Sequence, residues 1–177
     1  MSSAHLKWPG LSPHGTLVIS VDRNRFDMLP GALEFHGRIF KPKHETHITV
    51  FGSTTGAVVR RSIQQDPSME KRIIEAFEHT DWSWTTMGEY RHLARTANDS
   101  TSALDTEDSI IVLIEMNGMQ SFYGKLKELG IVDKQLPVPP PHVTLYTSNC
   151  DTGIGVHSAD ELEQLTRARL DQSDGTV

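Results

Sequence analysis

Two short segments of the sequence share one pattern: a histidine, a threonine two residues later and an aromatic residue two residues after that. They are residues 47–51 (HITVF) and 142–146 (HVTLY). Their residue types are typical of β-strands, in which successive side chains point to opposite faces. The pattern predicts two strands, each with its histidine, threonine and aromatic residue on one face and its two aliphatic residues in a core.

The context of these two segments sets them apart from other His-x-Thr (HxT) matches. The chain has nine histidines, and the bare pattern also occurs at His14 and His44. Only the copies at 47 and 142 have apolar residues at both the second and the fourth position. About half of the chain separates them, as an internally duplicated architecture requires. We therefore expect the two strands to line one central cleft.

Two histidines and two threonines facing one cleft suit the cleavage of a phosphodiester. Opening a cyclic phosphodiester requires one proton to leave the attacking water and another to reach the leaving ribose oxygen. Histidine can do either near neutral pH. Threonine hydroxyls can donate hydrogen bonds to the nonbridging oxygens as charge develops there. His47 and His142 are therefore the candidate catalytic residues, and Thr49 and Thr144 are the candidate phosphate-binding residues.

Four further residues are candidate substrate contacts. Phe51 and Tyr146 follow on the same predicted strand faces, where each could pack beside a base or ribose, or else belong to the core. Lys43 precedes the first motif and could reach a phosphate, with a solvated surface lysine as the alternative. Arg91 lies in a predicted strand over residues 90–95, where its planar guanidinium could clamp a phosphate or face solvent.

The paired motifs resemble those of the two-histidine phosphoesterase superfamily. That superfamily includes bacterial RNA 2′,3′-cyclic phosphodiesterases (the 2′-5′ RNA ligase family), plant and yeast cyclic nucleotide phosphodiesterases and RNA-trimming relatives. The resemblance implies a pair of pseudo-symmetric lobes, with the motif strands lining the cleft between them. It also implies activity on a cyclic phosphate or 2′-5′ phosphodiester of a nucleotide or RNA end, with a 2′-phosphate as the product of cyclic phosphate opening.

Three alternatives stay open at this point. A metal-dependent hydrolase could use His44, His47 and a carboxylate, but a zincin helix needs His-Glu-x-x-His, and here the spacing is one residue short and leads into a strand. We therefore expect no metal and no cofactor. A binding module of the same fold could hold a nucleotide or RNA end without turnover, although all four His and Thr residues are intact. A hydrolase of cyclic oligonucleotide signals is the third alternative.

The charge and composition of the chain limit its partners and location. A formal net charge of −6 argues against nonspecific binding of long duplex nucleic acid, which favours a small nucleotide or an RNA 3′-end as substrate. The single cysteine, Cys150, excludes an intramolecular disulfide and is typical of a reducing compartment. Residues 1–15 contain no apolar stretch typical of a leader, and no run approaches membrane-spanning length, so we expect neither. We expect a cytoplasmic monomer without membrane contact.

The order of predicted elements gives an α+β fold, with two β-rich lobes each backed by helices. We expect residues 1–177 to form a single bilobal domain in which residues 1–13 and 171–177 are flexible and residues 96–109 are a surface loop between the lobes. Besides the two motif strands, the first of which is expected over 46–51, the pattern predicts strands at 16–21, 33–40, 90–95 and 110–116 and helices at 66–78, 119–129 and 158–170.

Overall fold

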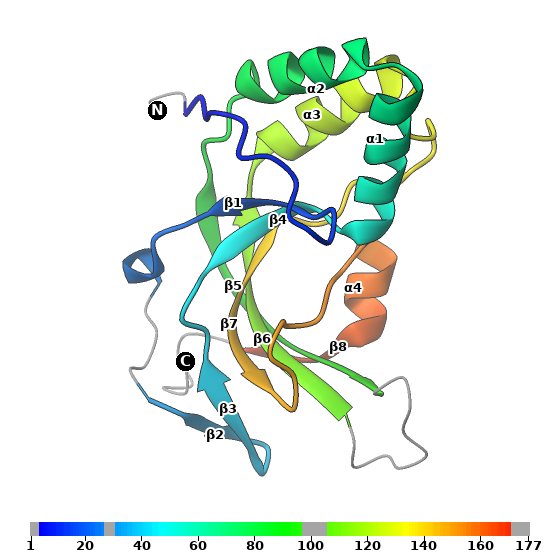
Figure 1. Ribbon diagram of the computed structural model, residues 1–177. Coiled ribbons are helices and arrows are strands. Elements are labelled where there is room, and N and C mark those ends of the chain that lie inside the picture. The colour runs from blue at the N-terminus through cyan, green and yellow to red at the C-terminus, as the bar shows by residue number, and fades with distance from the viewer. Residues whose placement is uncertain (1–3, 27–30, 97–105, 171–177) are drawn as a thin grey trace.

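The computed structural model describes residues 4–26, 31–96 and 106–170 and has a mixed α+β fold (Figure 1). Within these ranges, four α-helices, one short 3₁₀ helix (Arg23–Arg25) and eight strands follow one another along the chain. The strands are β1 (Leu17–Ser20), β2 (Leu33–Phe35), β3 (Arg38–Pro42), β4 (His47–Phe51), β5 (Thr85–Thr96), β6 (Thr106–Glu115), β7 (His142–Ser148) and β8 (Thr166–Leu170). The α-helices are α1 (Ser53–Gln65), α2 (Ser68–Glu78), α3 (Asn117–Glu128) and α4 (Ala159–Leu165).

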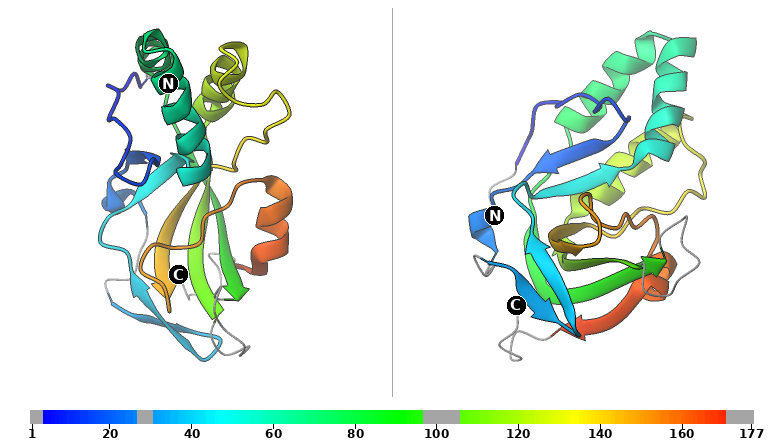
Figure 2. Two further views of the ribbon diagram at one scale, coloured as in Figure 1. Left: turned by 45° about the vertical axis from the view of Figure 1, so that its right-hand side comes forward. Right: turned by 60° about the horizontal axis from the view of Figure 1, so that its bottom comes forward.

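The strands form one antiparallel sheet in the order β1-β4-β7-β6-β5-β8. Strand β7 is the junction of this sheet, because β6 pairs along one of its edges while β4 and then β3 pair along the other. Strand β2 joins only through its hairpin with β3. The sheet is strongly curved, with the β2–β3 hairpin at the end away from helices α1 to α3 (Figures 1 and 2).

Strand β6 separates two apolar clusters on opposite faces of the sheet. Its residues Ile110, Val112 and Ile114 belong to the larger, first cluster, whereas Ile111 and Leu113 belong to the second. Because side chains alternate along a strand, the two clusters cover the two faces of the sheet.

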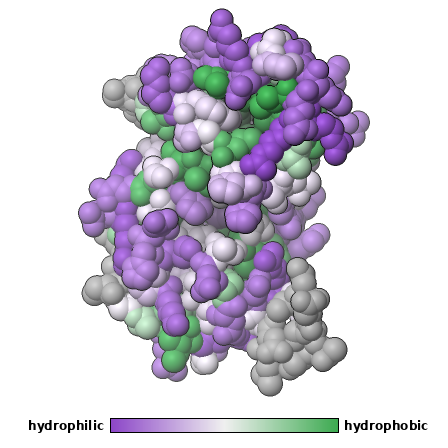
Figure 3. Space-filling view, in the orientation of Figure 1, coloured by the Kyte–Doolittle hydropathy of each residue, from purple (hydrophilic) through white to green (hydrophobic). Residues whose placement is uncertain are grey.

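The helices divide between these clusters. Buried residues of α1, α2 and α3 belong to the first cluster, namely Val59, Ile73, Phe77, Met119, Phe122, Tyr123 and Leu126. Helix α4 contributes Leu162 to the second cluster. In Figure 3 the outer surface is mostly hydrophilic, with small apolar areas between the upper helices and the sheet and at the lower end. None of the helices in the described ranges has the length and apolar composition needed to cross a lipid bilayer.

Several predicted elements are confirmed by the structure. Both motif segments are strands, and helices α2 and α3 lie within about two residues of their predicted ranges. Helix α4 begins at the predicted position with a capping interaction, in which the Ser158 hydroxyl accepts a hydrogen bond from the Glu161 amide. Gly130, with φ +70°, follows the end of α3 as a left-handed residue.

Other predicted elements are wrong in extent. The last helix ends at Leu165, because residues 166–170 pair with β5 as β8. The strand predicted over 33–40 is a hairpin, whose turn residues His36 and Gly37 have φ of +49° and +72°. Helix α1 was not predicted, since it contains glycine and several β-branched residues, which have low intrinsic helix propensity.

The expected flexible segments are also corrected where the structure describes them. Residues 4–13 pack against the helices instead of forming a free arm: Trp8 contacts Phe77 edge to face, and the amide of Trp82 bonds the carbonyl of Ala4. Residues 106–109 of the predicted loop belong to β6, and Thr96 belongs to β5. The rest of that loop and residues 171–177 lie outside the described ranges.

Candidate active site

The register of the sheet brings the two HxT motifs together on one face. Ile48 of β4 pairs with Val143 of β7, which in turn pairs with Val112, and all three side chains belong to the first cluster. The residues on either side of that pair, His47 and Thr49 on β4 and His142 and Thr144 on β7, therefore point to the opposite face. We call this the HxT face. The antiparallel register sets each histidine across from the threonine of the other motif.

The aromatic residues of the two motifs do not lie on the HxT face, because the register of both strands shifts before them. Each strand contains a register shift directly after its threonine. Consecutive residues of β1 pair with Thr49 and Phe51, and consecutive residues of β6 pair with Thr144 and Tyr146, so that one residue of each motif strand is skipped. Such an irregularity adds a residue to one strand and re-aims the side chains that follow. Phe51 and Tyr146 are consequently 0% exposed within the first cluster, and the expectation that they contact a substrate is corrected.

His142 is buried and its ring is held by the backbone before it. Its Nδ1 lies 2.9 Å from the carbonyl oxygen of Pro140. Because a carbonyl can only accept, Nδ1 carries the proton, and Nε2 remains the nitrogen for chemistry. Burial lowers the pKa of His142, the hydrogen bond to Pro140 opposes this, and the nearby charge of His47 lowers it further.

His47 is half-buried and also disfavours its charged form. Burial is the largest cause that lowers its pKa, and the positive charge of Lys43 adds to it, whereas Glu45 acts in the opposite direction. His47 and His142 lie on the same face of the paired strands β4 and β7, and the charge of His47 lowers the pKa of His142. A positive charge on His47 therefore opposes protonation of His142.

The segment between β7 and α4 (residues 149–158) borders the HxT face. Its carbonyl at Asp151 accepts a hydrogen bond from the Lys43 ammonium group at 2.5 Å, and the amide of Ile154 bonds Ser109 Oγ at 3.0 Å. Gly153, with φ +81°, lies directly against Thr144, since a Cβ built on it would be 3.0 Å from both Oγ1 and Cγ2 of that threonine. The charge of Lys43 affects His47, but its ammonium group, the candidate phosphate contact, is bound to a backbone carbonyl.

Arg91 is on the same face of the sheet but is not available to a substrate. It is 5% exposed and forms ion pairs with Glu89 and with Glu163 of α4. The prediction that it clamps a phosphate is therefore corrected, because both sides of its guanidinium are bound by carboxylates of the protein.

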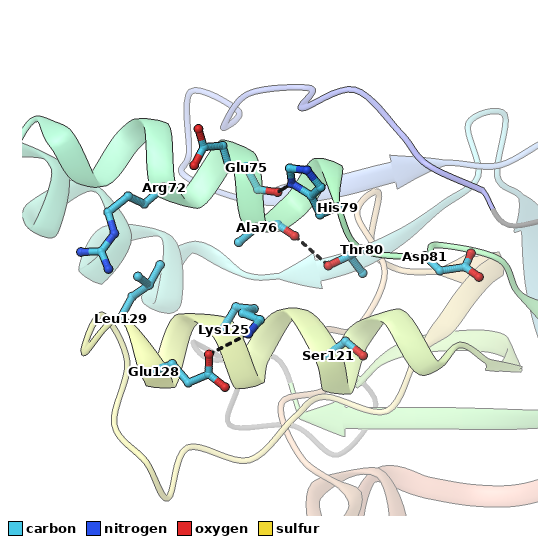
Figure 4. Close-up of a pocket in the computed structure, with 10 residues that line it drawn as sticks. All are labelled: Arg72, Glu75, Ala76, His79, Thr80, Asp81, Ser121, Lys125, Glu128 and Leu129. Carbon is cyan, nitrogen blue, oxygen red and sulfur yellow. Dashed lines mark hydrogen bonds and ion pairs between the residues drawn. The ribbon is translucent and has the colours of Figure 1, made fainter.

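A groove of about 590 Å³ lies elsewhere, between helices α2 and α3 (Figure 4). The side chains on its walls bond mainly to their own helices: His79 Nδ1 to the Glu75 carbonyl, Thr80 to the Ala76 carbonyl, and Lys125 to Glu128. The groove shares no residue with the HxT face, and its polar groups do not converge on one point.

Metal ligands do not cluster around the histidine pair. His44 is exposed, and within the described ranges no three His, Cys, Asp or Glu side chains gather in a geometry that could hold a metal ion.

Comparisons of the chain with protein-family models, with curated proteins and with solved structures find no match. The candidate site therefore rests on its own geometry. Sequence patterns did not identify two of its parts, the Pro140 carbonyl and Gly153. The three prolines before His142 are a signal for a rigid approach to that histidine, but no local pattern connects Gly153 with Thr144.

Proposed function

We propose that this protein is a metal-independent phosphodiesterase of the two-histidine type. Its substrate would be a cyclic phosphate or a 2′-5′ phosphodiester of a nucleotide or RNA end. The observation that carries the proposal is the pair His47 and His142, on one face of adjacent strands, where the charge of His47 lowers the pKa of His142. Such a pair supplies one proton acceptor and one proton donor at the same phosphate.

In the proposed reaction, one imidazole is neutral and takes a proton from the attacking water. The other is an imidazolium and protonates the leaving ribose oxygen. This chemistry needs one proton on the pair, and a charge on His47 opposes the addition of a second proton at His142. Thr49 and Thr144 donate hydrogen bonds to the nonbridging oxygens, where charge increases in the transition state. The scheme requires no cofactor.

The proposal includes a cleft along the HxT face between two β-rich lobes of related architecture. The matched register shifts in β4 and β7 support a duplicated origin, because each strand has the same order of histidine, threonine, shift and buried aromatic residue. A cytoplasmic monomer acting on a small nucleotide or RNA 3′-end remains part of the proposal.

Hydrolysis of a 2′,3′-cyclic nucleotide tests this function directly. We expect the protein to hydrolyse this substrate to a 2′-phosphate, and we expect this activity to persist in the presence of EDTA. His47→Ala or His142→Ala should each lower kcat/KM by about 10²–10⁴, and the double variant should be little worse, because the two residues act as a unit. His44→Ala is the matched control, since His44 is exposed and only three residues away, and it should keep its activity.

The alternatives give different results in the same experiment. Loss of activity on chelation with rescue by zinc or manganese would support a metal-dependent hydrolase instead. Tight nucleotide binding without product would support a binding module. A panel with 2′-5′ linked oligoadenylates, ADP-ribose cyclic phosphate and cyclic oligonucleotides, read by mass spectrometry, separates the substrate classes.

A further inference from the structure

Lys43 connects both HxT motifs to the segment that borders them. Its backbone amide donates to the Leu145 carbonyl at 2.8 Å, which fixes residue 43 beside β7. Its side chain then reaches the Asp151 carbonyl across a sequence separation of 108 residues. A single residue therefore bridges the connection that leads into β4 and the segment that follows β7.

The far end of this bridge controls the surroundings of Thr144. Asp151 is two residues from Gly153, whose backbone lies against the Thr144 side chain. The next residue, Ile154, is 1% exposed in the second cluster and bonds Ser109 through its amide. The segment is thus anchored on one side by apolar burial and on the other by the Lys43 ammonium group, with Gly153 between the two anchors.

We propose that Lys43 is a positioning residue of the HxT site, which ties residues 149–158 in place and so holds Gly153 against Thr144. This inference rests on the proposed function for its effect on turnover, but its structural part stands without it. Lys43 also acts on the other motif, because its charge opposes protonation of His47. Two other titratable groups belong to these surroundings: Glu45, two residues before His47, raises the pKa of His47, and His142 on β7 has its own pKa lowered by the charge of His47.

Substitutions at Lys43 and at Lys41 test the proposal. Lys43→Met removes both the charge and the donor, whereas Lys43→Arg keeps both. Lys41→Met removes the same charge from an exposed residue of β3, two positions away, and is the matched control. Circular dichroism checks that each variant is folded.

Two readouts do not depend on catalysis. In an NMR titration, the His47 imidazole of Lys43→Met should have a higher pKa than in the unmodified protein, because a repelling charge is gone. Lys43→Arg and Lys41→Met should match the unmodified protein. The amide of Ile154 should exchange its hydrogen about tenfold faster in Lys43→Met alone, because one anchor of the segment is lost. An unchanged His47 pKa, or an unchanged exchange rate, in Lys43→Met overturns the proposal, as does an equal effect of Lys41→Met.

The third readout is kcat/KM on a 2′,3′-cyclic nucleotide. Lys43→Met should lose about 10- to 100-fold, since displacement of a positioned group by about 1 Å has effects of this size, and Lys43→Arg should recover most of it. If the unmodified protein is inactive on this nucleotide and on the whole substrate panel, the proposed function fails while the NMR and exchange results still decide the role of Lys43. If it is active and Lys43→Met is equally active, the positioning role is overturned.

Discussion

At the scale of single residues, the surroundings of His47 and His142 determine their protonation. His142 is buried with one ring nitrogen bound to Pro140, and His47 is half-buried beside Lys43. Burial lowers the pKa of both below the ordinary value of 6.5. The lowered pKa values favour the neutral form of both imidazoles in the free protein, so that protonation of the pair requires a lower pH than protonation of an ordinary histidine.

This charge state predicts the pH dependence of turnover. kcat/KM reports the free enzyme and should be bell-shaped, with its acidic limb from protonation of the base and its alkaline limb from deprotonation of the acid. Because both pKa values are lowered from 6.5, we expect the maximum below pH 6.5 and a decline as the pH rises through 7. Circular dichroism over the same range separates the acidic limb from unfolding. A maximum above pH 7.5 would contradict the assigned environment.

At the scale of elements, helix α1 sits against the N-terminal segment through a glycine. The Arg60 side chain of α1 donates to the carbonyls of Ser12 and Pro13, and Gly56 approaches the backbone of Gly15. A Cβ on Gly56 would be 2.6 Å from the Gly15 carbonyl carbon and closer still to its oxygen. This contact between two main chains and the Arg60 hydrogen bonds hold the segment before β1 against α1.

Two glycine substitutions test this contact, and they should change the free energy of unfolding in opposite directions. Gly56→Ala should lower the free energy of unfolding by about 1–3 kcal/mol, because backbone atoms must move to admit the methyl group. Gly124→Ala in α3 has no atom within 4 Å of the new Cβ and should raise stability by about 0.5–1 kcal/mol, as alanine favours a helix. Urea denaturation measures both. Equal effects of the two changes would mean that α1 is not seated on the N-terminal segment.

At the scale of the whole molecule, a buried polar cluster joins the β2–β3 hairpin to the main sheet. The Asp108 carboxylate of β6 accepts from His92 Nε2 of β5 at 2.7 Å and pairs with Arg38 of β3 at 3.1 Å. Phe35 and Phe40 meet the His92 ring edge to face. The cluster lies on the face opposite the HxT motifs, because His92 pairs with Ile110 of the first cluster. Its role is therefore to hold the curved sheet together.

Substitution of two neighbouring carboxylates, one in the buried cluster and one outside it, tests this role. Asp108→Asn should lower the free energy of unfolding by about 3–5 kcal/mol, because it leaves the Arg38 charge without its buried partner. Glu107→Gln breaks the partly exposed pair with Arg95 and should cost at most about 1 kcal/mol. Chemical denaturation of both variants makes the comparison. Similar small losses would show that the buried cluster does not stabilise the fold.

Local sequence determined much of this protein. The strand character of both motif segments and the capping of α4 follow from residue types within a few positions. The sharing of one face by His47 and Thr49, and by His142 and Thr144, follows from strand periodicity alone. These features depend on backbone geometry that repeats every two or about four residues, so a short stretch of sequence contains the information.

Only the tertiary structure decided which side chains share a site. The pairing of β4 with β7 unites the two motifs, and the register shifts after Thr49 and Thr144 turn both aromatic residues into the core. Glu163 of α4 forms an ion pair with Arg91, and a carbonyl of the β7–α4 segment accepts a hydrogen bond from Lys43. Each of these outcomes depends on hydrogen bonds between residues far apart in the chain. Periodicity along a strand specifies the alternation of its faces, but not its partner or the point at which the register shifts.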